Sequence, residues 1–180
     1  TGLSLTNKRI PNSQVSWKKI LIEVFYSKDQ AGQEGAKFTP SGPEYYYNHA
    51  VYTEGFSYNG LGLGTPLITP LNFSRENQAS DPINYFINNK VVALHLGILG
   101  QIMKWDIIFK STISRNFGDY RTSGPSEQWF DGNRIAQNFP YGKYIPVNQF
   151  SGYFETSREL KNSYRFGLIL ANDYGKLLNN

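Results

Sequence analysis

The stretch that decides the fold is KWDIIFKSTISR, at Lys104–Arg115. Asp106 and Lys110 fall on one parity of this stretch. Ile107 and Phe109 fall on the other. Because successive side chains of a β-strand point to opposite faces, the stretch predicts a strand with one polar and one apolar face. The apolar face meets a protein core in a soluble sandwich and lipid in an outer-membrane barrel.

Five further stretches predict strands by alternation or by apolar runs between turn formers. The six expected strands are about 2–6, 15–27, 90–100, 104–117, 148–157 and 163–173. The connections alternate short and long, and the long ones are about 28–89 and 118–147. If consecutive strands are antiparallel, every short turn lies at one end and both long segments lie at the other. Outer-membrane barrels have this arrangement, with short periplasmic turns and long extracellular loops.

The charged residues of the other strands also keep to one parity. Lys19 and Glu23 share one face of the second strand, and Arg165 and Asp173 share one face of the last. Mixed signs on this face favour cross-strand ion pairs over an ion path. His95 falls on the same face, where we expect it to bond to a neighbouring strand.

These patterns predict an all-β, antiparallel, up-and-down transmembrane β-barrel. Residues 1–180 form a single segment of it, with about six strands of a larger barrel. Six strands cannot close a membrane barrel, which needs at least about eight, and open edges leave backbone groups unpaired in lipid. We therefore expect further strands before Thr1 and after Asn180, or from another chain. The alternative is a soluble sandwich with one wet face.

Composition excludes several classes of protein. The chain has no cysteine, which excludes disulfide scaffolds and thiolate metal sites. The net charge is +4, and no run of Lys or Arg marks a nucleic-acid-binding face. With two His and no Cys we expect neither a metal site nor a cofactor. The 13 Tyr, 12 Phe and 3 Trp suit strands, membrane girdles and sugar-stacking surfaces alike.

One stretch of the first long segment, YYYNHAVYTEGFSYNGLGLGTPLI at Tyr45–Ile68, resembles the long loop of the capsule assembly (Wzi) family from Bacteroidetes-type bacteria. Three further stretches are similar and follow the family's order: IEVFYSKDQAG (Ile22–Gly32), INNKVVALHLGILG (Ile87–Gly100) and FGLILANDYGKLLNN (Phe166–Asn180). The resemblance covers nearly the whole chain. It implies an outer-membrane barrel of about eighteen strands, of which this chain is the C-terminal third without the last strand. It also implies a lectin-like anchor for capsular polysaccharide that is not an enzyme.

Candidate polysaccharide-binding residues lie in both long segments. They are Tyr45, Tyr46, Tyr47, Asn48 and His49 in the first segment, and Arg121, Trp129 and Arg134 in the second. Aromatic faces stack on sugar rings, Asn, His and Tyr groups bond to hydroxyls, and arginines suit an acidic capsule. The alternative is that the rings pack the first segment onto itself and that the charges of the second pair locally.

We therefore expect a Gram-negative outer-membrane protein that binds or anchors surface polysaccharide at the cell surface through its extracellular loops. The expected partners are the lipid bilayer, surface or capsular polysaccharide and other outer-membrane proteins, without nucleic acid. The alternative is a transport- or secretion-associated barrel that partners or plugs a larger complex. We expect no enzyme, because the spacing of Glu44 and Glu54, or of Glu127 and Asp131, does not indicate a glycosidase pair.

Overall fold

The structure is a computed structural model that describes residues 1–8, 14–28, 47–49, 51–123, 127–130, 133–136, 138–160 and 164–179. It contains two compact units. The sheet unit comprises Thr1–Phe25, Ala93–Ser114 and Gln149–Gly175. The loop unit comprises Tyr26–Val92, Arg115–Asn148 and Lys176–Asn180. Within the described ranges, no helix has the length and apolar character needed to span a membrane.

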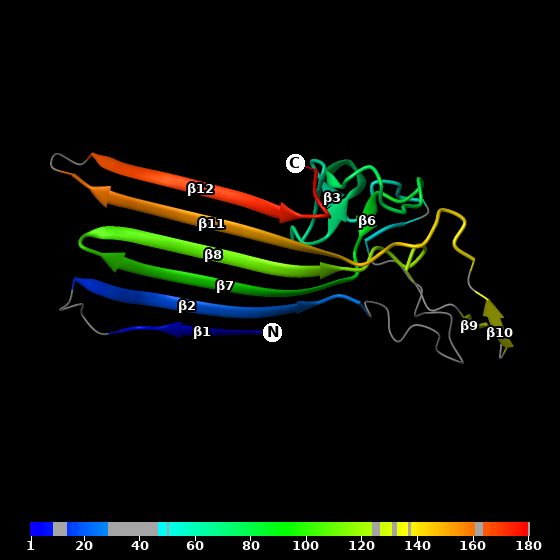
Figure 1. Cartoon of the computed structure of the whole chain (residues 1–180), viewed down its shortest axis with the longest axis horizontal. Coiled ribbons are helices and arrows are strands. Elements are labelled where there is room, and N and C mark those ends of the chain that lie inside the picture. Colours follow the sequence, from blue (N-terminus) through cyan, green and yellow to red (C-terminus); the bar gives the residue numbers. More distant parts are fainter. Residues whose placement is uncertain are drawn as a thin grey trace. The chain divides into compact units, whose positions relative to one another are not determined.

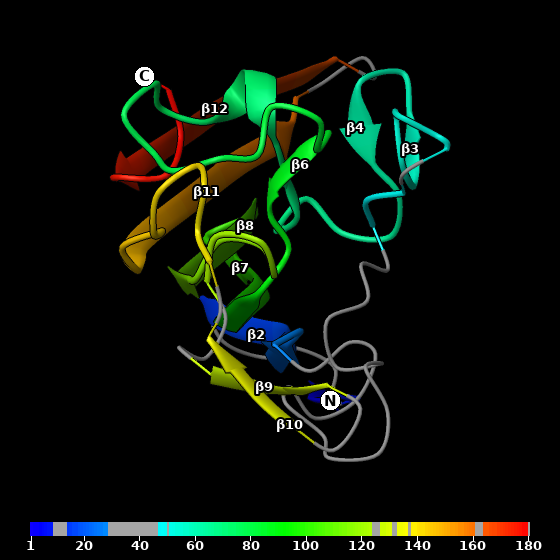
Figure 2. The ribbon, with the colours of Figure 1, turned by 90° about the vertical axis from the view of Figure 1, so that its right-hand side faces the viewer.

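Six long strands form one sheet. They are β1 (Gly2–Thr6), β2 (Val15–Tyr26), β7 (Val91–Ile102), β8 (Trp105–Asn116), β11 (Val147–Glu159) and β12 (Arg165–Gly175). They lie side by side in chain order as an antiparallel meander (Figure 1). The all-β antiparallel prediction is confirmed, and each expected strand lies within a few residues of its observed range. The sheet is open, with β1 and β12 as separate edges (Figure 2).

The turn between β7 and β8 differs from the expected one. The sequence placed it near residues 101–103 and put Lys104 in the following strand, which is wrong. Met103 and Lys104 form the turn and have positive φ values of 48° and 71°. Positive φ at both central residues is typical of a type I′ hairpin turn, whose right-handed twist matches the flanking strands. Neither residue is the Asn or Gly that usually marks this turn, so the sequence signal is missing.

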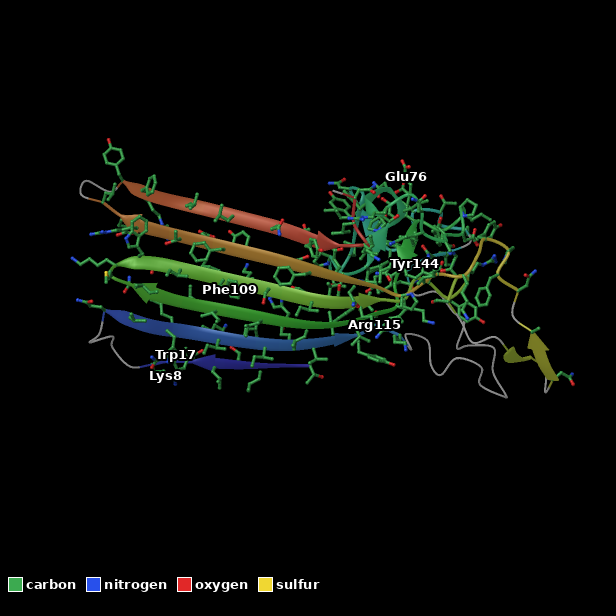
Figure 3. All side chains as sticks on the ribbon, in the orientation of Figure 1. Lys8, Trp17, Glu76, Phe109, Arg115 and Tyr144 are labelled. Carbon is green, nitrogen blue, oxygen red and sulfur yellow. The ribbon has the colours of Figure 1, made fainter. Side chains whose placement is uncertain are left out.

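One face of the sheet is apolar and uncovered. In the β11–β12 register, Phe154 pairs with Leu170 and Thr156 with Leu168. Leu168 and Leu170 are 50% and 55% exposed, and on the opposite edge Leu3 is 56% exposed. Figure 3 shows the side chains standing off the strands, with Phe109 labelled midway along β8. The soluble-sandwich alternative requires such side chains to be buried under a second layer, and these exposures are those of a free face.

The polar face carries a cluster of opposite charges near the hairpin turns. Asp106 Oδ1 accepts hydrogen bonds from Lys18 Nζ at 2.8 Å and from Gln101 Nε2 at 3.4 Å. Asp106 Oδ2 lies 3.9 Å from Arg165 Nη2, and Arg165 also donates to Ser157 Oγ at 2.7 Å. The cluster joins five of the six strands, β2, β7, β8, β11 and β12. The predicted cross-strand ion pairs are therefore present.

A change of register explains why Lys18 reaches this face. At one end of the β2–β7 pair Ser27 N donates to Val91 O at 2.9 Å, whereas at the other end Met103 N donates to Gln14 O at 2.8 Å. These two pairs differ by one residue in register, so β2 holds one extra residue between them. Such a bulge re-aims side chains. It turns Lys18 to the polar face and Trp17 to the apolar face, where simple alternation predicted the reverse.

Two further contacts brace the middle of the polar face. His95 Nδ1 lies 2.7 Å from Thr112 Oγ1 on the next strand, as expected from the sequence. The Lys110 ammonium lies 5.2 Å from the centre of the Tyr153 ring. The Tyr153 hydroxyl donates to Glu155 Oε2 at 2.6 Å. Lys110 and Glu155 are therefore engaged by neighbours within the sheet.

The loop unit contains short elements that the sequence analysis did not predict. They are β3 (Ser57–Tyr58), β4 (Leu61–Gly62), β5 (Thr69–Pro70), the 3-10 helix η1 (Leu71–Phe73), β6 (Phe86–Asn88), β9 (Glu127–Phe130) and β10 (Asn133–Ala136). β3 pairs with β4, β5 with β6 and β9 with β10, all antiparallel. Asn59 and Gly60 join β3 to β4 with φ values of 49° and 83°. This Asn-Gly turn is the usual signal for a tight hairpin and could have been recognised.

Apolar and amide side chains together form the interior of the loop unit. Its buried apolar residues are Ile68, Phe86, Ile87, Val91, Tyr144 and Leu177. Among them lies the buried Asn88, whose Nδ2 donates to Asn116 Oδ1 at 3.0 Å and whose Oδ1 accepts from Gly118 N at 3.1 Å. The amide thereby satisfies main-chain and side-chain groups that would be costly to bury without partners.

Gly118 is predicted to be indispensable for this interior. Its φ is +84°, and a Cβ there would lie 2.6 Å from Tyr144 Cγ and 2.9 Å from Thr122 Oγ1. Gly118→Ala adds backbone strain and overpacking, and should lower the free energy of unfolding by about 3 kcal/mol. Gly64→Ala is the matched control, because Gly64 has φ +90° but no atom within 4 Å of the added Cβ. It should cost only about 1 kcal/mol. Equal losses in denaturant titrations of the two variants would contradict this account.

Candidate functional site

Two of the predicted binding residues of the first long segment, Tyr47 and Asn48, pack within the loop unit. Asn48 is only 3% exposed. Its Nδ2 donates to Phe86 O at 2.9 Å and its Oδ1 accepts from Phe86 N at 2.8 Å, so the side chain pairs with β6 as a neighbouring strand would. The Tyr47 ring meets the rings of Phe56 and Phe86 edge-on, at 6.3 and 5.7 Å between centroids. Tyr45 and Tyr46 lie outside the described residues.

His49 lies at the surface, and a local turn orients its ring. Its Nδ1 accepts hydrogen bonds from Val51 N at 3.1 Å and from Tyr52 N at 3.2 Å. The ring lies 5.0 Å from that of Tyr52, which is largely exposed. Because Nδ1 is an acceptor, neutral His49 carries its proton on Nε2 and can donate it outward. His49 and Tyr52 thus form an exposed aromatic pair with one directed donor.

The predicted binding residues of the second long segment are Arg121, Trp129 and Arg134, and only the first has a described side chain. Arg121 Nη1 lies 3.1 Å from Asp81 Oδ2, and the Arg121 side chain is 50% exposed whereas that of Asp81 is 1% exposed. Arg121 thus pairs with a carboxylate of the first long segment and not with one of its own segment, and half of its side chain still faces solvent. Trp129 and Arg134 are direct partners in the register of β9 and β10. Their side chains lie outside the described part of the structure.

A groove of about 520 Å³ lies beside η1 in the loop unit. Its lining residues are Thr53, Leu71, Asn72, Pro82, Ile83, Asn84 and Tyr85. The half-buried Tyr85 offers an aromatic wall, and the exposed Asn72 and Thr53 offer amide and hydroxyl groups. A ring face together with hydrogen-bonding groups is the chemistry that binds a sugar, and the volume is that of a small-molecule site. The groove is not apparent in the sequence, because its residues come from three separate stretches.

A second groove of about 370 Å³ shares Leu71 and Asn72 with the first. Its other lining residues are Ser74, Arg75, Glu76, Gln78, Ser80 and Asn179. Arg75 Nε donates to Leu178 O at 3.0 Å, which attaches the C-terminal segment to this wall. Figure 3 labels Glu76 at the outer surface of the unit, and the side chain is exposed. The two grooves flank η1 and together form a surface of mixed apolar and polar character, which we call the η1 grooves.

A buried carboxylate supports one wall of the first groove. Asp119 Oδ2 accepts from Asn84 Nδ2 at 2.5 Å, and Oδ1 accepts from Thr122 N at 2.9 Å and Thr122 Oγ1 at 2.7 Å. Burial raises the pKa of Asp119 above its ordinary value of 3.8, and the nearby Asp81 carboxylate raises it further. The hydrogen bonds from Thr122 and Asn84 oppose this rise without cancelling it.

The chemistry of the η1 grooves suits binding of hydroxyl-rich ligands. Their polar groups are amides, hydroxyls, a phenol, one guanidinium and one carboxylate. Within the described ranges, no three His, Cys, Asp or Glu side chains gather as a metal site. Tyr144, in the interior of the same unit, donates its hydroxyl to Gln78 Oε1 at 3.2 Å, and burial raises the pKa of this phenol. The buried phenol thus positions Gln78, one of the lining residues.

Asp119 should give the loop unit a distinct pH dependence. Because the pKa of Asp119 is higher in the folded state than in the unfolded state, the folded state binds the proton more tightly. The stability that this group contributes is full below the unfolded-state pKa and is lost as pH rises through the folded-state pKa. The measurement is the free energy of unfolding at pH values from 3 to 8. Asp119→Asn should remove the decrease in this free energy that accompanies ionisation of Asp119 as the pH rises. Glu76→Gln, at an exposed position, is the control, and parallel curves for all three proteins would refute the assignment.

Comparison with known proteins yields no match for this chain. No protein-family model, curated protein or solved structure matches it. The functional assignment therefore depends on the sheet, the η1 grooves and the sequence resemblance described above.

Proposed function

We propose that this chain forms part of the wall of a Gram-negative outer-membrane β-barrel of the capsule assembly type, and that its extracellular loops bind or anchor surface polysaccharide. The observation that carries the proposal is the sheet with one uncovered apolar face and one internally paired polar face. Half-exposed aliphatic side chains along several strands form a surface that soluble monomers rarely present to water. Contact with lipid would cover such a face.

Strand length supports the same environment. β7 and β8 each have 12 residues, and β11 and β12 have 13 and 11. A strand of that length extends about 40 Å, and a tilt of about 35–45° reduces its span to about 30 Å. This matches the hydrocarbon thickness of a bilayer. In lipid the open edges β1 and β12 need partners, so the proposal requires further strands from the same protein or from another chain.

The loop unit supports the binding part of the proposal. In the first η1 groove, Tyr85 supplies a ring face and Asn72 and Thr53 supply hydrogen-bonding groups. His49 and Tyr52 add an exposed aromatic pair nearby in the sequence. Asn48 has a structural role in this account, because its amide is engaged by the Phe86 main chain. Tyr45, Tyr46, Trp129 and Arg134 remain candidates from the sequence.

The membrane location is tested by fractionation. The full chain should remain with the outer membrane through carbonate and urea washes and should need detergent for extraction. The reason is that removal from the membrane would expose the apolar face of the sheet to water, which is unfavourable. A soluble monomer that needs no detergent would exclude the barrel and leave only a soluble binding module.

The polysaccharide role is tested by substitutions in the first groove. Tyr85→Ala and Asn72→Ala should each weaken binding to surface polysaccharide by about tenfold, as expected for loss of a stacking ring or of a hydrogen bond with its partner left unpaired. Tyr58→Ala, at an exposed position outside the groove, should have no effect. Tyr46→Ala and Trp129→Ala test the candidates from the sequence. Binding and capsule retention unchanged in all variants would favour the transport- or secretion-associated alternative.

A further inference from the structure

A separate groove lies on the apolar face of the sheet unit, close to the β7–β8 turn. Its volume is about 380 Å³, and its lining residues are Ile102, Met103, Trp105, Ile107, Thr156 and Arg158. In the groove as described, five of these six residues are neutral and Arg158 is the single ionisable one. Arg158 is the penultimate residue of β11, so its guanidinium lies at the end of this apolar face, where a bilayer would place lipid headgroups.

Aromatic rings hold the Arg158 side chain on this face. The Arg158 guanidinium carbon lies 5.9 Å from the centre of the Trp105 ring. The Trp105 ring in turn meets the Phe166 ring edge-on at 6.2 Å. The three side chains come from β11, β8 and β12 and form a row across neighbouring strands. A cation over a Trp face is attracted by the ring quadrupole and keeps its charge available to an anion.

Among the described residues, no acidic side chain at this end of the sheet forms a salt bridge with Arg158. Asp106 is adjacent to Trp105 in β8 but lies on the opposite face, where it is paired with Lys18 and Arg165. In the β11–β12 register Arg158 pairs with Phe166, whereas Glu159 pairs with Arg165. Glu159 therefore shares the polar face. The apolar groove has a positive charge at its rim and aliphatic side chains along its floor.

We propose that this groove binds one phospholipid with an anionic headgroup, and this proposal rests on the membrane location proposed above. The headgroup phosphate contacts the Arg158 guanidinium, whose planar donors suit two phosphate oxygens. An acyl chain lies along Ile102 and Ile107. Trp105 and Phe166 occupy the depth at which aromatic side chains meet headgroups.

The test uses Trp105 as a reporter in the full chain. Trp17→Phe and Trp129→Phe leave Trp105 as the single tryptophan. This protein is reconstituted in phosphatidylcholine vesicles that contain a small fixed fraction of a brominated lipid, either phosphatidylglycerol or phosphatidylcholine. Bromine quenches tryptophan fluorescence on contact. Brominated phosphatidylglycerol should quench Trp105 more than brominated phosphatidylcholine at the same mole fraction, because the anionic lipid is enriched in the groove.

Arg158→Gln should reduce the preference for phosphatidylglycerol about fivefold, as expected for one cation near an anionic headgroup. Arg158→Lys keeps the charge but loses the planar donors, and should give an intermediate preference. Lys110→Gln is the matched control, because it removes a positive charge from the opposite face of the sheet, where the Lys110 ammonium lies over the Tyr153 ring. It should leave the preference unchanged.

The outcomes separate this proposal from the membrane location. Strong but equal quenching by both brominated lipids would overturn the headgroup site and leave the membrane location intact. Absence of quenching by either lipid would overturn both. An unchanged preference in Arg158→Gln would assign the effect to another site. If Arg158→Gln does not fold, the headgroup site is still tested by comparing quenching by the two lipids in the single-tryptophan protein and in Arg158→Lys. Equal preference in these two proteins would contradict a role for the planar guanidinium.

Discussion

The alternation of side chains along paired strands is the constraint on which the rest of this structure depends. The register keeps aliphatic residues on one face and almost all charges on the other. A slip of one residue would reverse the faces of a strand. Asp106 resists such a slip, because its contacts with Lys18, Gln101 and Arg165 tie β8 to three other strands. In lipid a slipped β8 would place Lys110, near the middle of the strand, among acyl chains, where a Lys costs about 2–4 kcal/mol at the midplane.

The long segments depend on a different principle, since they have little regular structure to satisfy their backbone. Buried amides and carboxylates replace the missing strand partners. Asn48 bonds to both main-chain groups of Phe86, and Asn88 connects Asn116 to the backbone of Gly118. Asp119 links Asn84 to Thr122 in the same way. Such networks give a loop region an interior of its own, and this interior fixes the walls of the η1 grooves.

Period-two patterning was enough to predict the six long strands and their antiparallel order, because it is a local property of each stretch. Features set by tertiary context were not predictable in that way. The bulge that re-aims Lys18 and Trp17 leaves no mark in the alternation. The Met103–Lys104 turn uses residues that do not favour positive φ. For the candidate site, the sequence pointed to the aromatic loop and to Arg121. It did not indicate that Asn48 pairs with β6, or that Tyr85 and Asn72 share a groove, because those relations join distant stretches.

The polar face bears on the choice between an anchor and a conducting pore. An ion path needs charges of one sign that remain available to a passing ion. Here Asp106 is compensated by Lys18 and Arg165, the Lys110 ammonium lies over the Tyr153 ring, and Glu155 accepts from the Tyr153 hydroxyl. Neighbouring strands compensate these charges, so the contacts brace the sheet. Little net charge would remain to select a passing ion. For the proposed binding role, specificity would come from groups outside this face, and the η1 grooves gather aromatic, amide and hydroxyl groups around an open volume. That distribution favours a protein that holds a ligand at its loops over one that conducts along its sheet.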